Sequence, residues 1–490
     1  MRKASIYLFV ILLPLLGCSD DFVDVESADA NSENFFNTEQ DYQNALIGAY
    51  DLLQTTYLNV MLGEIASNNT LAGGESATDV VGIQQIDDMI HTPINQQLVD
   101  IWGWMYAGVN RANYIMEFQD NLDFNSKNSV LAQTRFLRAY YYFELTKWFG
   151  DVPLVIDQRV SFGVQFELDR TPQSEVYAQI EADLIYASEN LGYETADVGR
   201  AGKGAALALL GKVYLFQNKY QEAATVLDQV INESPFVLEE DFSQLFENDN
   251  ENNNESVFEV QYTDLEGASF DCFQCSEGNI AVGFNGPRNF NGPLFESGFS
   301  FNVPTQEAYD AYTENDLRRD YAILNIELFA EENQDYNEGA GVSWTEGFEH
   351  TGFFNRKYIP RVGDMNIGDQ NLTNPNNYRA IRYADVLLMA AEAHVKGSIN
   401  TPLAQSYVNQ VRTRAGLGPT STTGNDLVEV IYLERRLELM GEGHHFFDLV
   451  RTGRAAQQIE GFVPGKHELF PIPEIEIQLT GNRWQQNPGY

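Results

Sequence analysis

Cysteine is almost absent from this 490-residue chain, and its scarcity excludes several kinds of small cross-linked domain. Only Cys18, Cys272 and Cys275 occur. Three cysteines cannot form a multi-disulfide framework, and one C-x-x-C pair without a second pair or nearby histidines does not complete a four-ligand zinc site. No βαβ pattern surrounds the pair, which argues against a thioredoxin-like motif. We therefore predict a loop-closing disulfide between Cys272 and Cys275.

Basic residues are also few. The chain has 30 Lys and Arg residues against 71 Asp and Glu residues, which gives a formal net charge of −41. Such a surface repels phosphate backbones and anionic lipid headgroups. We expect no nucleic-acid partner and no basic membrane-binding patch. The same charge also suits solubility in a saline habitat.

No apolar run reaches the roughly 20 residues that a membrane-spanning helix needs. The run at residues 4–16 follows a basic start and precedes Gly17 and Cys18, which is the layout of a secretory signal. The order Leu-Leu-Gly-Cys is typical of a bacterial lipobox. We predict that residues 1–17 are a signal peptide, that Cys18 is lipidated and that residues 18–34 form a flexible acidic tether. An ordinary signal peptide cut elsewhere is the alternative.

Recognisable catalytic motifs are missing as well. The six histidines form no H-E-x-x-H, no G-x-S-x-G occurs, and the glycines near Lys203 lack P-loop spacing. The pair His444-His445 favours a packing or capping role over metal binding. A glycosidase needs only two carboxylates, and nothing distinguishes one acidic pair from the others. The acidic and amide residues 248–256 resemble part of a calcium loop, but a solvated turn is favoured. We expect no cofactor, with a structural calcium ion left unproven.

Helical periodicity dominates the first half of the chain. Apolar residues recur at spacings of three and four in residues 41–53, 98–118, 129–150 and 174–191. Residues 202–235 have the spacing of a tetratricopeptide repeat, with Leu210-Gly211, Tyr214, Ala223, Leu227, Val230 and Pro235 at its key positions. A looser version recurs at residues 383–417. We predict a mainly α fold in which tetratricopeptide-like helix pairs stack into a curved α-α superhelix.

The region between residues 241 and 375 is different, because long stretches rich in Gly, Asn, Phe and Pro show no helical period. Loops this long inside a compact protein are usually functional, and their aromatic content argues against disorder. We predict a large irregular ligand-binding region here. Helices resume at Tyr378, and in the last long one Leu427, Val430, Leu433, Leu437 and Met440 mark the predicted buried face.

Several stretches, taken in order, resemble the SusD/RagB family of outer-membrane nutrient-binding lipoproteins of Bacteroidetes. They include Cys18 with acids behind it, "ALIGAYDLL", "TRFLRAYYYFELTKWFGDVPLV", "GRAGKGAALALLGKVYL", "IRYADVLLMAAEAH", "ERRLELMGEGHHFFDLVRTG" and "PIPEIEIQ". Individually several are bland, but their order across the mature chain is specific. The division we predict is an N-terminal helical region at 35–240 and a C-terminal region at 241–490.

The resemblance implies a lipid-anchored protein on the outer face of the outer membrane. It also implies a partner, a SusC-like TonB-dependent transporter, to which the protein delivers glycan or peptide. The acids that follow Cys18 look like the surface-export signal of such lipoproteins. Ligand contacts vary within the family, so the resemblance supplies no contact residues.

The candidate contacts are therefore chosen on physical grounds. Sugar rings present apolar C–H faces and a hydroxyl rim, which suit exposed aromatic rings flanked by polar side chains. Trp344 is the first choice, with a buried loop anchor as its equal alternative, whereas Trp102, Trp148 and Trp484 are expected in the core. The other candidates are Phe348, Phe284, Asn285, Arg288, Asn289, Asn68, Asn69, Glu75 and Asp79.

Together these patterns predict a non-catalytic cell-surface protein that captures an oligo- or polysaccharide. The acidic composition favours a neutral one such as a β-glucan or a fructan. Two alternatives stay open: an outer-membrane glycoside hydrolase, and an envelope scaffold that binds no small ligand.

Overall fold

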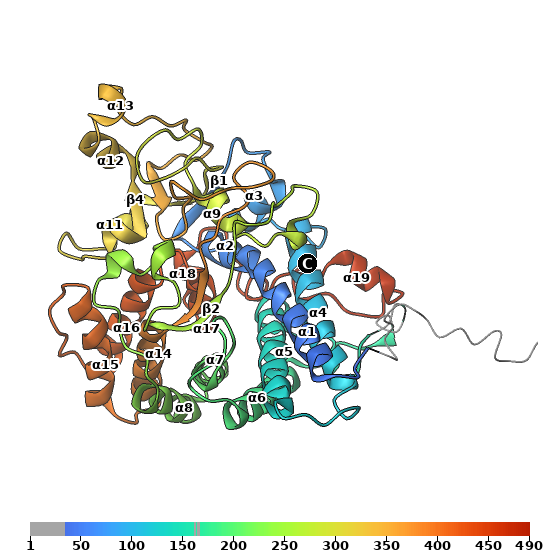
Figure 1. The fold of residues 1–490 in the computed structure, drawn as a ribbon. Helices are drawn as coiled ribbons and strands as arrows, with labels where there is room; N and C mark the ends of the chain where they lie inside the picture. The colour runs from blue at the N-terminus through green and yellow to red at the C-terminus, as the bar shows by residue number, and fades with distance from the viewer. Residues whose placement is uncertain (1–34, 161–162, 164–166) are drawn as a thin grey trace, which may run out of the picture.

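The computed structural model describes residues 35–490 except 161–162 and 164–166. Long helices fill one side of the molecule, and short strands, short helices and loops gather on the other side (Figure 1). Cys18, the predicted signal peptide and the predicted tether lie outside the described residues. Within the described part, no helix combines the length and the apolar character that crossing a membrane requires.

The N-terminal helices begin with a well-defined cap. The Thr38 hydroxyl accepts a hydrogen bond from the backbone N–H of Asp41, and the Asp41 carboxylate accepts one from the backbone N–H of Thr38. This reciprocal pair satisfies donors that a helix start leaves free. The helices of this part are α1 (Glu39–Asp51), α2 (Tyr57–Ile65), α3 (Val81–Asp87), α4 (Gln96–Glu117), α5 (Lys127–Phe149) and α6 (Gln173–Asn190), with the 3₁₀ helix η2 (Leu52–Thr56) after α1.

The predicted tetratricopeptide-like pair is present as α7 (Lys203–Phe216) and α8 (Tyr220–Glu233). Gly211 lies where the two helices touch, because a Cβ there would come within 2.5 Å of the Leu227 side chain. Leu227 and Val230 are fully buried against α7. The small residue thus permits the close helix contact that the repeat spacing predicts.

A second pair packs against the first and extends the helical wall. Helix α14 (Tyr383–Lys396) contacts α8, α15 (Thr401–Arg414) and α16 (Gly424–Glu438), while α6 contacts α5 and α7. Helices α4 to α8 and α14 to α16 therefore form a continuous curved layer across the lower part of Figure 1. The mainly α, tetratricopeptide-like fold is confirmed. The remaining C-terminal helices are α17 (His445–Arg451), α18 (Ala455–Gln458) and α19 (Glu474–Leu479).

Among the described residues, three two-stranded antiparallel sheets contain strands of the irregular region. Strand β1 pairs with β3, β2 pairs with β6, and β4 pairs with β5. Short helices and loops fill the space between them. The strands are β1 (Thr70–Gly73), β2 (Ser256–Val260), β3 (Phe301–Pro304), β4 (Ile323–Asn325), β5 (Phe353–Asn355) and β6 (Tyr378–Arg382); the helices are η4 (Phe242–Gln244), η5 (Asn248–Asn250), η6 (Phe273–Cys275), α9 (Ile280–Asn285), α10 (Gln306–Asp310), α11 (Arg319–Ala322), α12 (Ile326–Glu332) and α13 (Tyr336–Gly339).

The predicted buried face of α16 is partly wrong. Leu427 and Leu437 are buried, but Leu433 is 47% exposed. The inward face instead carries Glu434 and Glu438, both almost fully buried. These carboxylates are paired there with guanidinium groups from the irregular region and from α15.

Arg382, at the end of β6, is the centre of this buried ionic cluster. Its guanidinium lies 2.6 Å from Glu255, 2.8 Å from Glu438 and 2.7 Å from Glu442. Burial alone would raise the pKa of Glu438. The guanidinium groups of Arg414 and Arg382 have the larger, opposite effect, so the pKa of this carboxyl lies well below its ordinary range. The cluster therefore joins α16 to the irregular region through charges that are ionised and paired.

Candidate functional site

Three loop segments meet on the side of the molecule opposite the long helices. They are residues 73–79 after β1, residues 286–300 after α9, and residues 343–349 before β5. The backbone N–H of Phe348 donates to the carbonyl of Gly74 at 2.8 Å, and that of Thr345 donates to the carbonyl of Arg288 at 2.8 Å. These contacts fix three sequence-distant loops into one surface, which we call the aromatic-loop surface.

Glycine allows the first of these loops to approach the third strand. Gly73 and Gly74 have φ values of 70° and 96°, and a Cβ on Gly73 would lie 2.2 Å from the Ser300 carbonyl oxygen. Only glycine tolerates both the left-handed backbone conformation and the lack of room for a side chain. The Gly-rich stretch after β1 is thus required for loop contact.

Arg288 supplies the charged part of the aromatic-loop surface. Its Nη2 lies 3.5 Å from Asp79 and donates to the Phe299 carbonyl at 3.1 Å, while its Nη1 lies 3.7 Å from Glu75. The Asp79 carboxylate also accepts a hydrogen bond from the Glu75 backbone N–H. Asn289 is exposed beside this group and donates to the Thr345 hydroxyl at 3.2 Å. The result is a rim of donors and acceptors.

Trp344 and Phe348 supply the aromatic part. Trp344 is half-buried and packs against a small apolar cluster that includes Phe290 and Phe329. Phe348 is half-buried as well. Trp344 is therefore both an anchor for its loop and a partly accessible ring. Half-buried rings on loops that are joined to a polar rim are the kinds of group that hold a sugar ring by stacking and hydrogen bonding.

Four of the predicted contact residues do not reach this surface. Asn285 is 2% exposed, and its side-chain amide donates a hydrogen bond to the Tyr358 carbonyl, which holds α9 against the interior. Phe284 is buried among other phenylalanines. Asn69 is fully buried between Glu64 and Arg436, and Asn68 is occupied by Glu307 and His445. Phe284, Asn285 and Asn69 stabilise the interior and are removed from the candidate set, whereas Asn68 is half-buried and its side chain is engaged by Glu307 and His445.

An aromatic residue that the sequence interpretation missed lies at the disulfide turn. Cys272 and Cys275 form a disulfide. Beside it Phe270 is 53% exposed, and its ring centroid lies 6.0 Å from that of Phe299, whose carbonyl binds Arg288. The turn therefore extends the aromatic-loop surface. The signal was the alternation of aromatic residues and cysteines in "SFDCFQC".

Two carboxyl groups lie beneath the Gly-rich loop. Asp87 accepts a hydrogen bond from the Ala72 backbone N–H at 2.7 Å, and Glu349 accepts one from the Gly73 backbone N–H at 3.3 Å. Burial raises the pKa of Asp87 to about 7, and the nearby charges of Glu349 and Asp88 raise it too. Burial also raises the pKa of Glu349. Asp87, which accepts a hydrogen bond from this loop, therefore changes its charge near neutral pH.

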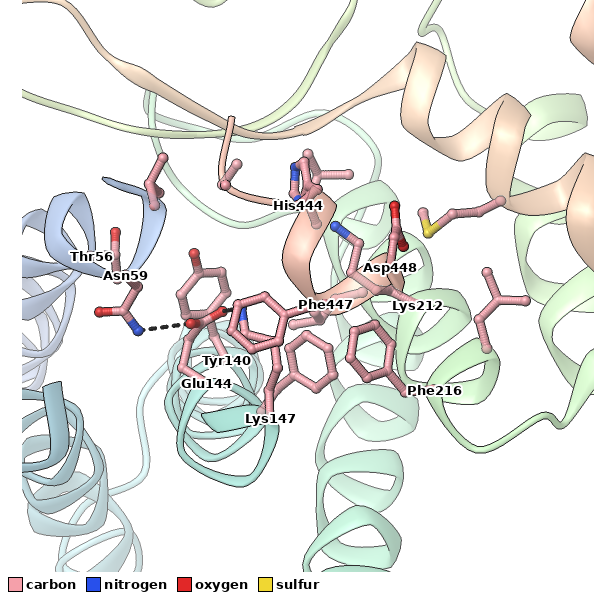
Figure 2. A pocket seen from close by; sticks show the side chains of 18 of the residues that line it. Thr56, Asn59, Tyr140, Glu144, Lys147, Lys212, Phe216, His444, Phe447 and Asp448 are labelled. Atoms are coloured by element: carbon pink, nitrogen blue, oxygen red, sulfur yellow. Dashed lines mark hydrogen bonds and ion pairs between the residues drawn. The ribbon is translucent and has the colours of Figure 1, made fainter. Parts of the chain in front are cut away.

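A separate cavity of about 40 Å³ lies inside the helical layer, between α5, α7 and the segment around α17 (Figure 2). Glu144 pairs there with Lys147 at 2.6 Å and accepts from Asn59 at 2.8 Å. Burial lowers the pKa of His444 to about 3, so its imidazole is neutral at physiological pH. The cavity has space for water but is too small for a sugar ring.

The acidic turn at residues 248–256 is held by protein groups. Glu251 accepts from the Asn377 backbone N–H, and Asn248 accepts from the Asn376 side chain at 2.8 Å. Across the described ranges, no three His, Cys, Asp or Glu side chains are grouped as a metal site would require. The contacts here favour a structural turn.

Comparison with known proteins places the chain in a family. A profile of the SusD family matches residues 254–490, and a profile described as "Starch-binding associating with outer membrane" matches residues 21–215. SusD-like protein P2 of Formosa agariphila is 30% identical over 528 residues, with all of both chains covered. The chain belongs to the SusD/RagB family, as its sequence predicts.

Solved structures show the same fold. A laminarin-binding SusD-like protein has a TM-score of 0.84 at 34% identity, covering 93% of this chain and 100% of its own. Surface glycan-binding protein A from Bacteroides thetaiotaomicron, in complex with laminarihexaose, has a TM-score of 0.79 at 26% identity, covering 92% of this chain and 100% of its own.

Proposed function

We propose that the protein is a cell-surface glycan-binding lipoprotein that captures a β-1,3-glucan and delivers it to a SusC-like TonB-dependent transporter. The observation that carries this proposal is the backbone contact that joins the loops of Trp344 and Phe348 to the loops of Arg288 and Asp79. Related structures that bind laminarin or laminarihexaose support the choice of glucan. A neutral polymer also suits a chain with net charge −41.

The strength of capture follows from the kind of contacts. A stacked ring pair contributes about 0.5–1.5 kcal/mol beyond its buried area, and a hydrogen bond contributes about 0.5–1.5 kcal/mol. A few such contacts on an open surface give modest affinity, which allows release to a transporter. The side chains of the aromatic-loop surface would hold and orient the glycan, and the proposed role is binding without catalysis.

Calorimetry with a panel of glycans tests the binding. Laminarin and laminarihexaose should bind, whereas inulin, a fructan, and alginate, a polyuronate, should bind weakly or not at all. If none of these glycans bound, the proposal would be contradicted. Reducing-end release from laminarin would favour a glycoside hydrolase instead.

Delivery and anchoring need their own tests. A large β-barrel protein should co-purify with the full chain from membranes of the native host. A Cys18→Ser chain should move from the membrane fraction to the soluble fraction, and protease added to intact cells should digest the wild-type protein. Retention of the Cys18→Ser chain in the membrane would contradict lipid anchoring at this residue.

A further inference from the structure

We propose that a second saccharide subsite lies in a pocket between α1, the loop before α7 and the end of β2; this inference rests on the proposed function. The pocket has a volume of about 330 Å³. Small-molecule sites span about 300–1,000 Å³, so the pocket suits a short stretch of sugar residues. Its lining residues are separate from those of the aromatic-loop surface.

An unsatisfied arginine lines this pocket. Nη1 of Arg200 is buried and has no hydrogen-bond partner within the described part of the chain. The guanidinium carbon lies 5.0 Å from the centroid of the Tyr50 ring, and the carboxylate of Asp197 is 3.9 Å from Nε. A buried donor without a partner costs about 1–3 kcal/mol. Nη1 itself is enclosed by the protein, but the Arg200 side chain as a whole is 18% exposed and lines the pocket, so a small rotation of the guanidinium would bring this donor to a ligand oxygen.

The charges around the pocket select a neutral ligand that both donates and accepts hydrogen bonds. Asp51 is paired with Arg111, and Glu277 accepts from Gln54 at 2.9 Å. Of the three carboxylates that line the pocket, Asp51 pairs with Arg111 and Glu259 with Arg379, which leaves Glu277 and Arg200 as opposite charges that together favour neither an anion nor a cation. A sugar hydroxyl can accept from Arg200 and donate to the Glu277 carboxylate. The pocket therefore fits a neutral polyol.

Apolar side chains at the pocket edge complete this chemistry. Ile47 is 53% exposed and Val198 is 71% exposed, which leaves both available to the C–H faces of a sugar. The loop that carries Val198 is seated closely, because a Cβ on Gly199 would lie 2.4 Å from the Gln261 side chain. The pocket wall is thus formed before any ligand arrives.

The pocket and the aromatic-loop surface flank the same disulfide turn. Glu277 lines the pocket two residues after Cys275. On the other side, the ring of Phe273, within the turn, lies 6.3 Å from that of Phe284, and Phe270 contacts Phe299. The two sites therefore offer one polymer separate contact points on either side of a cross-linked turn.

Saturation-transfer NMR with laminarihexaose tests the subsite in the full-length chain. In Trp344→Ala, the sugar protons should still receive saturation from the pocket. Adding Arg200→Gln should reduce this residual signal at least threefold. Ile47→Glu, at an exposed position that tolerates substitution, should do the same by placing a charge at the pocket edge. Glu194→Gln, an exposed change in the same loop, is the matched control and should leave the signal unchanged.

The outcomes separate the two proposals. If wild-type protein binds laminarihexaose but the residual signal is absent in Trp344→Ala, or survives both Arg200→Gln and Ile47→Glu, the subsite is rejected and the proposed function stands. If wild-type protein binds neither laminarihexaose nor laminarin, the proposed function fails and the subsite fails with it.

Discussion

The helical layer and the loop-bearing side of this protein are stabilised in different ways. The helices pack through hydrocarbon side chains and small residues, as at Gly211 against Leu227. The loops are held by ion pairs and buried amides, as at Arg382 with Glu255 and at Asn285 with Tyr358. Repetitive packing builds a support, while specific polar contacts fix an irregular surface. The difference explains how one helical scaffold can present a ligand surface without regular structure in it.

The largest expected effect comes from breaking the ionic cluster between the two regions. Arg382→Met leaves the carboxylates of Glu255, Glu438 and Glu442 buried with fewer partners. Removing one member of a buried ion pair costs about 3–5 kcal/mol. We expect the free energy of unfolding, measured in urea by circular dichroism, to fall by about that amount.

A surface ion pair provides the control for this change. Arg319 pairs with the exposed carboxylate of Asp320. Exposed pairs contribute about 0–1 kcal/mol, so Arg319→Ala should change the free energy of unfolding little. Equal losses in the two variants would contradict the role assigned to the buried cluster.

The second effect concerns the ligand surface alone. Trp344→Ala should weaken laminarin binding at least tenfold in calorimetry, because the stacking ring and its contact area are lost; tenfold corresponds to about 1.4 kcal/mol. Trp344→Phe should retain part of the affinity. Tyr220→Ala, which removes a half-exposed ring from α8 in the helical layer, should have no effect on binding. An unchanged affinity in Trp344→Ala would show that laminarin binds at another surface.

How far the sequence predicts the molecule differs between the same two regions. The helices were predictable because apolar spacing reports burial, as Leu227 and Val230 show. The α16 face was not, since Glu434 and Glu438, with Glu442 in the turn after the helix, recur every four residues and are buried because arginines from other segments meet them. A regular row of acids on a helix normally indicates solvent.

The candidate site was predictable in part for a similar reason. Composition identified the loops that carry Trp344 and Arg288, since these long segments are rich in aromatic residues and show no helical period. Which polar residues point outward was not predictable, because Asn285 and Asn289 lie four positions apart and only the second is exposed. Backbone direction in an irregular loop depends on contacts with other loops, and sequence spacing does not encode them.

A smaller effect should follow from opening the disulfide turn. Replacing Cys272 and Cys275 with serine frees the loop that carries Phe270, and ordering a free loop on binding costs conformational entropy. We expect laminarin affinity to fall about threefold, while the urea midpoint of the helical layer stays the same. Treating wild-type protein with a reductant should reproduce the loss; an unchanged affinity in both would show that the turn lies outside the ligand surface.

The smallest predicted effect is a pH dependence of the Gly-rich loop. Burial raises the pKa of Asp87 to about 7. Because the folded pKa lies above the unfolded value, the stability contribution is full at low pH and is lost as pH rises through about 7. Above pH 7 the charged Asp87 also repels Glu349 beneath the loop. Laminarin affinity should fall about twofold between pH 6 and pH 8.5.

Asp87→Asn isolates this charge. The amide keeps the size of the side chain and stays neutral, so the affinity of this variant should be the same at both pH values. A pH dependence that persists in Asp87→Asn would assign it to another group.

The most direct test of the account compares the two regions in one hydrogen–deuterium exchange measurement with and without laminarin. Our account predicts slower exchange in residues 73–79, 268–300 and 340–350, with little change in α5 to α8 and α14 to α16. Protection confined to the helical layer, or no protection of the loops at a laminarin concentration that saturates binding, would contradict it.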